Sequence, residues 1–586
     1  MKVLLVGLNA KYIHSSLALY SIRAACRDAE YAVEVVEYTI NQEFLHVLGD
    51  IAGHEPNVIG IACYIWNREM VLKLAAALKK AIPGVCIFLG GPEASGDATD
   101  IMEKNSSVDF VLQGEGEESV PELLAQLMQG AEGLNVAGIA VRRDGKIELN
   151  GGVRLVNNLD SLRFPYQADE MQGLADRIIY YESSRGCPFS CSYCVSSTTS
   201  GVRYRSIEKV KEELAFFLRH GVKQVKFVDR TFNVDPNYYR EIWRFLATEP
   251  GVTNFHFEIV ADRLSREDVQ WLAQVPAGRF QFEIGVQSAC EETLAAIGRR
   301  NDWVRLQENV QGLLRTGNIH LHLDLIVGLP HEDWGRFKDS FNAVYGLKPD
   351  MLQIGFLKLL PGTRIREESA EHGYIGLDFP PYEILSNNVL SYTEVRRLKV
   401  LEEVFNQTYN SGRFVYTLSY LVTLFDGDAF RFYNELAQWW ERHSYVGKSH
   451  SPEGVLSRLL LFVERFSQEQ ILRAGELLKF DVLRDGSGAM KGERLNWNCE
   501  RWERQKTAFW RNESAVRQYV PGYRFGNWRD VKRKYPVEIF ALNIPQWITS
   551  GEWPEAGLTP ILFDFTRQHP VWHVLPANEL NTEDEQ

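Results

Sequence analysis

Short apolar strands alternate with helices along most of this chain, and this alternation restricts the fold more than any other feature. In the N-terminal part, the buried runs that we interpret as strands are residues 2–8, 32–38, 58–63, 85–89 and 108–112. Strands that are joined through helices form parallel sheets. We therefore expect an α/β protein in which residues 1–135 form a doubly wound, flavodoxin-like domain.

A second series of strands and helices covers residues 177–375. Helix starts are marked by Asp235 directly before Pro236, and by Ser265 three residues before Asp268. The predicted strands are residues 177–181, 225–229, 254–260, 279–286, 319–327 and 351–356. Six strand–helix units are too few for a closed eightfold barrel.

The remaining segments have different patterns. Residues 136–176 are a predicted connector, in which Asp144-Gly145 marks a hairpin turn. Residues 376–586 form a predicted accessory domain that is mainly helical and includes two strands. Its predicted helices cover residues 392–412, 415–443 and 452–480, and its strands cover residues 537–540 and 559–565.

Composition excludes several classes of protein. A chain of 586 residues is too long for one hydrophobic core. Its net charge of −13 gives no general attraction to nucleic acid. Eight cysteines are too few for a disulfide framework. The N-terminal apolar run is too short for a signal peptide, and no run of about 18 apolar residues predicts a membrane span. We expect a cytoplasmic protein.

Three cysteines are close together in one loop that follows the first strand of the second series. Cys187, Cys191 and Cys194 have C-x3-C-x2-C spacing. Iron–sulfur clusters usually take four cysteines, so three would leave one iron free for substrate or cofactor. A zinc site would need a second ligand pair, but Cys290 and Cys499 are isolated in the sequence.

The cysteine loop, including Tyr193 before the last cysteine, resembles the cluster loop of the radical S-adenosylmethionine (SAM) superfamily. The resemblance implies an open, TIM-like (β/α)6 barrel in residues 177–375. It also implies that Cys187, Cys191 and Cys194 bind a [4Fe–4S] cluster whose free iron is chelated by SAM. One electron would then cleave SAM to methionine and a 5′-deoxyadenosyl radical. A low-potential donor of the flavodoxin or ferredoxin type would be the partner.

The same resemblance assigns SAM contacts to the ends of the barrel strands. They are Asp229 for the amino group, Glu283 and Gln287 for the ribose, Gly328 for the adenine, and Pro361 after the last strand. Arg203 or Arg205 is a candidate for the SAM carboxylate.

Structural explanations exist for several of these residues. Asp229 can be a helix cap, and Glu283 can be half of an ion pair. His320 and His322 share one face of a predicted strand, and we interpret them as packing residues rather than ligands.

Glycines and polar residues gather at the predicted strand ends of the first domain, where ligands of such sheets bind. This part of the chain resembles the cobalamin-binding domain that precedes the barrel in one class of radical SAM enzymes. The D-x-H-x-x-G motif that places a histidine on cobalt in some cobalamin proteins is absent. Tight turns alone would also explain the glycines. The candidate cobalamin contacts are Asn9, Lys11, Tyr12, His14, Gly90, Gly91, Gly114 and Glu115.

The two resemblances together indicate a cobalamin-dependent radical SAM enzyme that methylates an unactivated carbon. One alternative is a radical rearrangement, a cyclisation or a methylthiolation without methyl transfer from cobalamin. Another alternative is a non-catalytic iron–sulfur sensor. The C-terminal part resembles an uncharacterised domain of some cobalamin-type radical SAM proteins, and the sequence does not identify the substrate.

Overall fold

The computed structural model describes residues 1–130, 134–198, 201–486, 490, 494–497, 501–553, 557–567, 571–576 and 579–580. Its chain divides into two compact units, Met1–Val395 and Arg396–Gln586. Cys499 lies outside the described residues.

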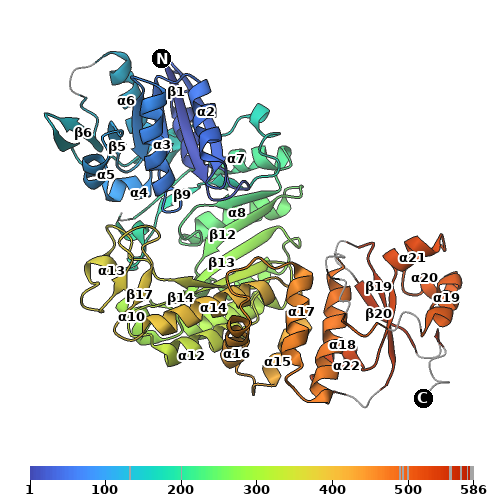
Figure 1. Ribbon diagram of the computed structural model, residues 1–586. Helices are drawn as coiled ribbons and strands as arrows, with labels where there is room; N and C mark the ends of the chain where they lie inside the picture. Colours follow the sequence, from blue (N-terminus) through green and yellow to red (C-terminus); the bar gives the residue numbers. More distant parts are fainter. Residues whose placement is uncertain are drawn as a thin grey trace. The chain divides into compact units, whose positions relative to one another are not determined.

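The first unit begins with a sheet of seven strands in the order β2-β1-β3-β4-β5-β6-β7, which we call the first sheet (Figure 1). Neighbours from β2 to β5 pair in parallel. The strands are β1 (Lys2–Asn9), β2 (Ala32–Thr39), β3 (Val58–Ala62), β4 (Cys86–Gly90), β5 (Phe110–Leu112), β6 (Ile139–Arg143) and β7 (Lys146–Asn150).

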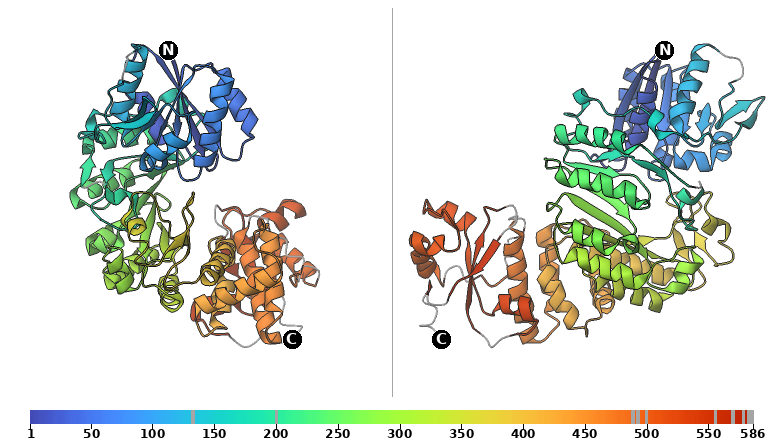
Figure 2. Two further views of the ribbon diagram at one scale, coloured as in Figure 1. Left: turned by 60° about the vertical axis from the view of Figure 1, so that its left-hand side comes forward. Right: turned by 180° about the vertical axis from the view of Figure 1, so that it is seen from behind.

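Helices cover both faces of the first sheet, as Figure 2 shows. Alternate residues of β1 enter opposite cores: Leu4 and Val6 pack in one, and Val3 and Leu5 in the other. This confirms the doubly wound α/β prediction. The helices are α1 (Leu17–Ala25), α2 (Phe44–Gly53), α3 (Arg68–Ala81), α4 (Pro92–Gly96), α5 (Ala98–Lys104) and α6 (Gly116–Met128).

The predicted hairpin at Asp144-Gly145 forms, but it belongs to the first sheet. Its strands β6 and β7 extend that sheet antiparallel beyond β5. Asp144 and Gly145 both have positive φ, of 47° and 78°, as this turn requires. Part of the segment predicted as a connector therefore completes the first sheet.

The second sheet of this unit, the barrel sheet, has six parallel strands in the order β15-β14-β13-β12-β11-β8. β8 and β15 are the two ends of this order, so the barrel is open, as predicted. The strands are β8 (Ile179–Tyr181), β11 (Gln224–Phe227), β12 (Asn254–Ile259), β13 (Phe280–Gln287), β14 (His320–Val327) and β15 (Met351–Phe356).

Helices follow the barrel strands, and two predicted caps form. Asp235 accepts a hydrogen bond from the Asn237 amide at the start of α8, and Ser265 with Asp268 makes a capping box at α9. The helices are α7 (Ile207–Arg219), α8 (Pro236–Thr248), α9 (Arg266–Leu272), α10 (Glu291–Ala296), α11 (Trp303–Leu314), α12 (Trp334–Tyr345) and α13 (Arg364–Glu367).

Smaller elements complete the first unit. Two antiparallel ribbons are formed by β9 (Ser184–Gly186) with β10 (Val202–Tyr204), and by β16 (Ile375–Gly376) with β17 (Ile384–Ser386). Short 3-10 helices lie at Leu159–Ser161, Ala168–Glu170, Val195–Thr198 and Ala261–Arg263.

Helices dominate the C-terminal part, as predicted. Two predicted helices are each divided in two: residues 415–443 at a turn where Asp426 and Gly427 have positive φ, and residues 452–480 at the Ser467 cap. The helices are α14 (Tyr392–Thr408), α15 (Val415–Thr423), α16 (Ala429–Arg442), α17 (Pro452–Val463), α18 (Gln468–Asp485), α19 (Glu503–Arg511), α20 (Glu513–Arg517), α21 (Trp528–Lys534) and α22 (Ile544–Ser550).

The two predicted C-terminal strands also form. They are β18 (Val537–Phe540) and β19 (Thr559–Asp564), and β20 (Val571–Val574) pairs antiparallel with β19. Within the described part of the chain, no helix combines the length and the apolar character that crossing a membrane requires.

Candidate active site

The three cysteines lie in one loop that begins where ribbon strand β9 ends. None of Cys187, Cys191 and Cys194 is in a disulfide. Gly186, just before this loop, has a φ of 103°, and a Cβ here would lie 2.2 Å from the carbonyl oxygen of Gly201. Only glycine permits this conformation and this close approach. The ribbon therefore fixes where the cysteine loop starts.

Neighbouring barrel segments hold the middle of the cysteine loop. The amide of Ser192 donates to the carbonyl of Ile297 at 2.9 Å, and its carbonyl accepts from the amide of Ile365 at 3.0 Å. Ile297 directly follows α10, and Ile365 lies in α13. The loop is thus anchored to segments that follow two other barrel strands.

Arg299 is a charged neighbour of the cysteines that the sequence did not single out. It donates to the carbonyl of Gly285 and to Asn301. Burial raises the pKa of the Cys191 thiol, and the Arg299 guanidinium opposes that shift. A nearby cation favours the thiolate, which is the form that binds metal. No motif marks Arg299 in the sequence.

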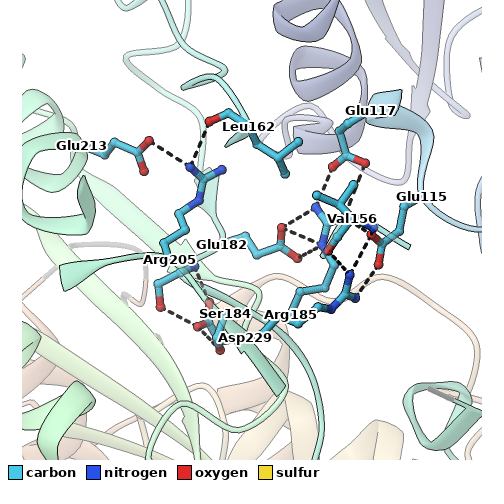
Figure 3. Close-up of polar contacts among 12 residues, drawn as sticks. Glu115, Glu117, Val156, Leu162, Glu182, Ser184, Arg185, Arg205, Glu213 and Asp229 are labelled. Atoms are coloured by element: carbon cyan, nitrogen blue, oxygen red, sulfur yellow. Dashed lines mark hydrogen bonds and ion pairs between the residues drawn. The ribbon is translucent and has the colours of Figure 1, made fainter. Parts of the chain in front are cut away.

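Asp229 is completely buried beneath the stretch that leads into the cysteine loop. It accepts hydrogen bonds from the Ser183 amide at 3.0 Å and from the hydroxyls of Ser183 and Ser184 at 2.6 Å (Figure 3). Burial raises its pKa to about 6 despite these bonds. Both carboxylate oxygens are thus engaged by the chain, and the predicted contact with the SAM amino group stays a prediction.

Gln287 ends β13 in an unusual conformation. Its φ is 71°, and its buried Oε1 has no hydrogen-bond partner among the described residues. Strained backbone and unsatisfied buried polar atoms concentrate at functional sites. The geometry is what a ligand contact would require, and the ribose contact predicted here remains a proposal.

Gly328 and Pro361 follow β14 and β15. The carbonyl of Gly328 accepts from the Tyr374 hydroxyl at 2.8 Å and from the Asn387 amide at 3.2 Å. Pro361 lies beside Gly96, the last residue of α4. A Cβ added to Gly96 would be 3.1 Å from the Cβ of Pro361. The predicted SAM positions after β8, β11, β13, β14 and β15 therefore lie at the carboxyl edge of the barrel sheet, where barrel enzymes place their chemistry.

Glu283 lies deeper in the barrel, four residues before Gln287. Its Oε2 is 3.0 Å from Lys226 Nζ on β11 and 2.9 Å from His256 Nε2 on β12. Burial opposes ionisation, but these two partners lower the pKa of Glu283 to about 2. The ion pair that sequence reasoning kept as an alternative is present.

Glu283 belongs to a polar wall on the inner face of the barrel sheet. Along β13, buried apolar side chains alternate with half-buried residues, and the apolar face packs through Phe282 against Trp243 of α8. The opposite face is polar on four consecutive strands. We call it the lumen wall, and its residues are Lys226, His256, Glu258, Glu283, His322 and Asp324.

The lumen wall departs from the usual barrel interior, which branched apolar side chains fill. Burial and the neighbouring Glu283 raise the pKa of Glu258 to about 7. Except for Glu283 and His322, sequence analysis missed these residues. A signal was available, because β12 reads Asn-Phe-His-Phe-Glu-Ile, with polar residues at every second position.

The glycines predicted for cobalamin lie at the carboxyl ends of the first sheet's strands. A Cβ at Gly90 would meet nothing within 4 Å, so this end of β4 is open. Gly91 has a φ of 104°, and a Cβ there would lie 2.6 Å from the carbonyl oxygen of Cys63. Gly114, after β5, bridges Arg154. An open backbone edge of this kind suits a large planar ligand.

Several other predicted cobalamin residues contact the chain itself. Asn9 donates to the carbonyl of His14 and to Glu37, both at 3.0 Å. His14 Nδ1 lies 2.8 Å from the hydroxyl of Tyr180 on β8. Lys11 and Tyr12 are exposed. The loop of residues 9–15 therefore joins the first sheet to the start of the barrel.

Glu115 takes part in a second junction (Figure 3). It pairs with Arg185 and with Arg203, each at 3.0 Å. Arg185 also lies 2.6 Å from Glu117 and 2.7 Å from Glu182. This junction connects α6 and the residue before it to the ribbon that leads into the cysteine loop.

Neither arginine that was predicted for the SAM carboxylate is free in this arrangement. Arg203 contacts Glu115, while Arg205 pairs with Glu213 at 3.2 Å and donates to the carbonyl of Leu162 (Figure 3).

Three family models match successive parts of the chain. They are the B12 binding domain over residues 3–124, the radical SAM superfamily over residues 181–344, and a protein of unknown function, DUF4080, over residues 370–563. Residues 181–344 therefore form a radical SAM domain. The B12 binding and radical SAM domains imply a [4Fe–4S] cluster, SAM and cobalamin, and the three cysteines of the loop and the open glycine edge fit these groups.

Similar proteins point to the same class. The cobalamin-dependent radical SAM methyltransferase TokK of Streptomyces tokunonensis is 29% identical over 309 residues, which cover 50% of this chain and 45% of TokK. The hopanoid C-3 methylase of Methylococcus capsulatus is 26% identical over 360 residues, which cover 59% of this chain and 67% of the methylase. This radical SAM protein spans about half the length of the first curated relatives that it matches.

A solved structure shares the fold of this radical SAM protein. The cobalamin-dependent SAM radical enzyme OxsB with aqua-cobalamin bound has a TM-score of 0.59 at 16% identity. The match covers 84% of this chain and 81% of OxsB. At this identity the likeness describes the fold alone.

Proposed function

We propose that this chain is a cobalamin-dependent radical SAM enzyme that methylates an unactivated carbon. One observation carries the proposal: a loop with three cysteines outside disulfides and a glycine-lined sheet edge belong to the same compact unit. When bound, the cluster supplies the electron that cleaves SAM to methionine and a 5′-deoxyadenosyl radical, and cobalamin supplies a methyl group.

The chain's own residues hold and orient these groups. Cys187, Cys191 and Cys194 would bind the cluster, with Arg299 favouring the thiolate form of Cys191. Gln287 would accept a hydrogen bond from a SAM hydroxyl through its unpartnered Oε1. Gly90 and Gly91 would let cobalamin approach the backbone closely. Asp229 is a positioning residue, because it acts on the cysteine loop through Ser183 and Ser184.

The lumen wall supports a polar substrate. Lys226, Glu258 and Glu283 would otherwise be costly to place inside a barrel. A substrate with hydrogen-bonding or charged groups would add contacts to these residues, whereas an apolar lipid chain would add none. We therefore propose a polar small molecule or a polar side chain of a peptide as the substrate class.

Methylthiolation is disfavoured by the positions of the other cysteines of the first sheet. That reaction would require a second cluster site made from Cys26, Cys63 and Cys86. Cys26 and Cys63 belong to the cores on opposite faces of the sheet. Three ligands of one cluster must lie around a single centre, which a sheet between them prevents.

We also propose the cytoplasm as the compartment and a low-potential flavodoxin or ferredoxin as the electron donor. The absence of a disulfide at Cys187, Cys191 and Cys194 fits a reducing compartment.

Anaerobic reconstitution with iron and sulfide, followed by SAM and a reductant, tests the proposed activity. We expect formation of 5′-deoxyadenosine and retention of cobalamin after desalting. Cys191→Ala should lose the cluster and SAM cleavage, while the matched variant Cys290→Ala, at the start of α10, should keep both. An intact cluster without any 5′-deoxyadenosine would refute the proposal. SAM cleavage without retained cobalamin would favour rearrangement or cyclisation.

A further inference from the structure

Three side chains of the lumen wall converge where β13 and β14 pair. His322 and Asp324 are two residues apart on β14 and so point to the same face. Glu283 on β13 is directly opposite His322 in the strand register. One ligand atom from each of the three lies within 4.8 Å of the others.

The contact between His322 and Asp324 lacks the geometry of a hydrogen bond. His322 Nε2 and Asp324 Oδ1 are 3.1 Å apart, yet both are buried atoms without a hydrogen-bond partner in the part of the chain that the structure describes. His322 is only 7% exposed. By contrast, His256 Nε2 and Glu283 Oε2 form a hydrogen bond at 2.9 Å. Buried polar atoms that lack partners are rare and require an explanation.

A metal ion explains this arrangement. We propose that Glu283, His322 and Asp324 bind a divalent transition-metal ion on the lumen wall. Nitrogen and oxygen ligands about 2.0–2.1 Å from a tetrahedral zinc ion are themselves about 3.3 Å apart. The separation of 3.1 Å between Nε2 and Oδ1 is close to that value. A shared metal ion would account for the two atoms facing each other at this distance.

The charges of the lumen wall are consistent with a bound cation. It carries three carboxylates, Glu258, Glu283 and Asp324, beside one lysine, Lys226, and two histidines, His256 and His322. Lys226 and His256 both contact Oε2 of Glu283. Its Oε1 receives no hydrogen bond from any described residue and is the oxygen available to the ion. A divalent cation would supply the missing positive charge.

The ligand set favours certain metals and leaves room for another ligand. One imidazole with two carboxylates suits Zn²⁺, Fe²⁺ or Mn²⁺. Three protein ligands leave a position free for water or for an oxygen atom of the substrate. The site itself does not depend on the proposed methylation, because its ligands lie outside the cysteine loop.

Zinc binding by the full-length, cluster-loaded chain tests the site. The protein is dialysed with Zn²⁺ and desalted, and zinc is counted by mass spectrometry. We expect the wild type to retain one zinc ion per chain, and His322→Gln or Asp324→Asn to bind at least about tenfold more weakly. His320→Gln should retain zinc, because His320 is on the same strand but is exposed beside Asp350.

Zinc X-ray absorption of the wild type gives an answer that does not require any variant to fold. We expect a shell of nitrogen and oxygen at about 2.0–2.1 Å, without sulfur at about 2.3 Å. A wild type that retains no zinc, a sulfur shell, or equal zinc in folded His322→Gln would overturn the site. Because metal content is measured separately from SAM cleavage, failure of one proposal is distinguishable from failure of the other.

Discussion

The guanidinium of Arg185, two residues before Cys187, lies 2.6 Å from the carboxylate of Glu117 at the start of α6. Both side chains are largely buried, at 18% and 10% exposure. Glu115 and Glu182 contact the same guanidinium. One arginine therefore ties the first sheet's edge to the stretch that carries the cysteines.

Replacing Arg185 should destabilise the first unit, because three carboxylates would lose their common partner. We expect Arg185→Ala to lower the free energy of unfolding by about 3 kcal/mol. Arg185→Lys should recover only part of this, since an ammonium does not bind carboxylates bidentately. Urea unfolding monitored by circular dichroism measures the change. Glu69→Gln, which removes an exposed ion pair with Lys73, should have no measurable effect and serves as the control.

Gly186→Ala should prevent cluster assembly. The added Cβ would lie 2.2 Å from the Gly201 carbonyl oxygen, so that β9 and β10 would have to separate. Iron and sulfide per chain after reconstitution are the measurement. Gly201→Ala also introduces a side chain at positive φ, of 80°, but into open space. It should therefore keep the cluster, and equal iron loss in both variants would contradict the steric explanation.

Gln287→Ala should weaken SAM binding by up to about tenfold, the effect of losing one hydrogen bond to the ligand. Calorimetric titration of SAM into the cluster-loaded protein measures the dissociation constant. Gln281→Ala is the matched control, because Gln281 lies on the same strand and face but at its far end. Unchanged affinity in Gln287→Ala would refute the proposed contact.

Gly91→Ala should lower cobalamin retention. Its Cβ would lie 2.6 Å from the Cys63 carbonyl oxygen, so the backbone at the end of β4 would have to move. The absorption of cobalamin per chain after desalting gives the occupancy. Gly84→Ala, at a φ of 85° but with no neighbour within 4 Å of the added Cβ, should bind as the wild type does. Similar losses in the two variants would argue against the glycine edge as the cobalamin site.

Glu332 should make stability depend on pH near neutrality. Burial raises its pKa from 4.5 to about 7, although Ser288 and Ser340 donate hydrogen bonds to it. Between about pH 4.5 and 7 the folded state keeps the Glu332 proton, whereas the unfolded state has released it. The free energy of unfolding that this protonation contributes is therefore full below about pH 4.5 and is lost as the pH rises to about 7.

Glu332→Gln keeps the acceptor oxygen without the charge. At pH 8 we expect this variant to be more stable than the wild type by about 3 kcal/mol, and at pH 4.5 the difference should nearly vanish. Thermal unfolding at both values checks this. The same difference at both pH values would show that ionisation of Glu332 is not the cause.

Local patterns were sufficient to predict the two parallel sheets and their order along the chain. Asp235 with Pro236 and Ser265 with Asp268 marked helix starts that formed as expected. These features depend on neighbours in sequence. The break of the predicted helix 452–480 was also encoded locally, since Ser467 and Gln470 form a capping box that the interpretation overlooked.

Contacts between distant residues were beyond such patterns. Asn9 and His14 are candidate cobalamin contacts by resemblance, but the local sequence does not indicate that His14 meets Tyr180, which is 166 positions away. Asp229, whose contact with SAM stays a prediction, accepts hydrogen bonds from the hydroxyls of Ser183 and Ser184, which its local sequence does not indicate. A motif identifies a chemically suitable residue, but whether its atoms remain available depends on tertiary neighbours that the local sequence does not specify.

The placement of the β6–β7 hairpin has a practical consequence for dissecting the protein. β5 has only three residues, and β6 covers its outer edge. A recombinant fragment cut at residue 135 would leave the backbone groups along that edge unpaired and open to strand addition by another molecule. A fragment meant to stay monomeric would need to continue at least through Asn150, the last residue of β7. The outer edge of β5 is then covered by β6.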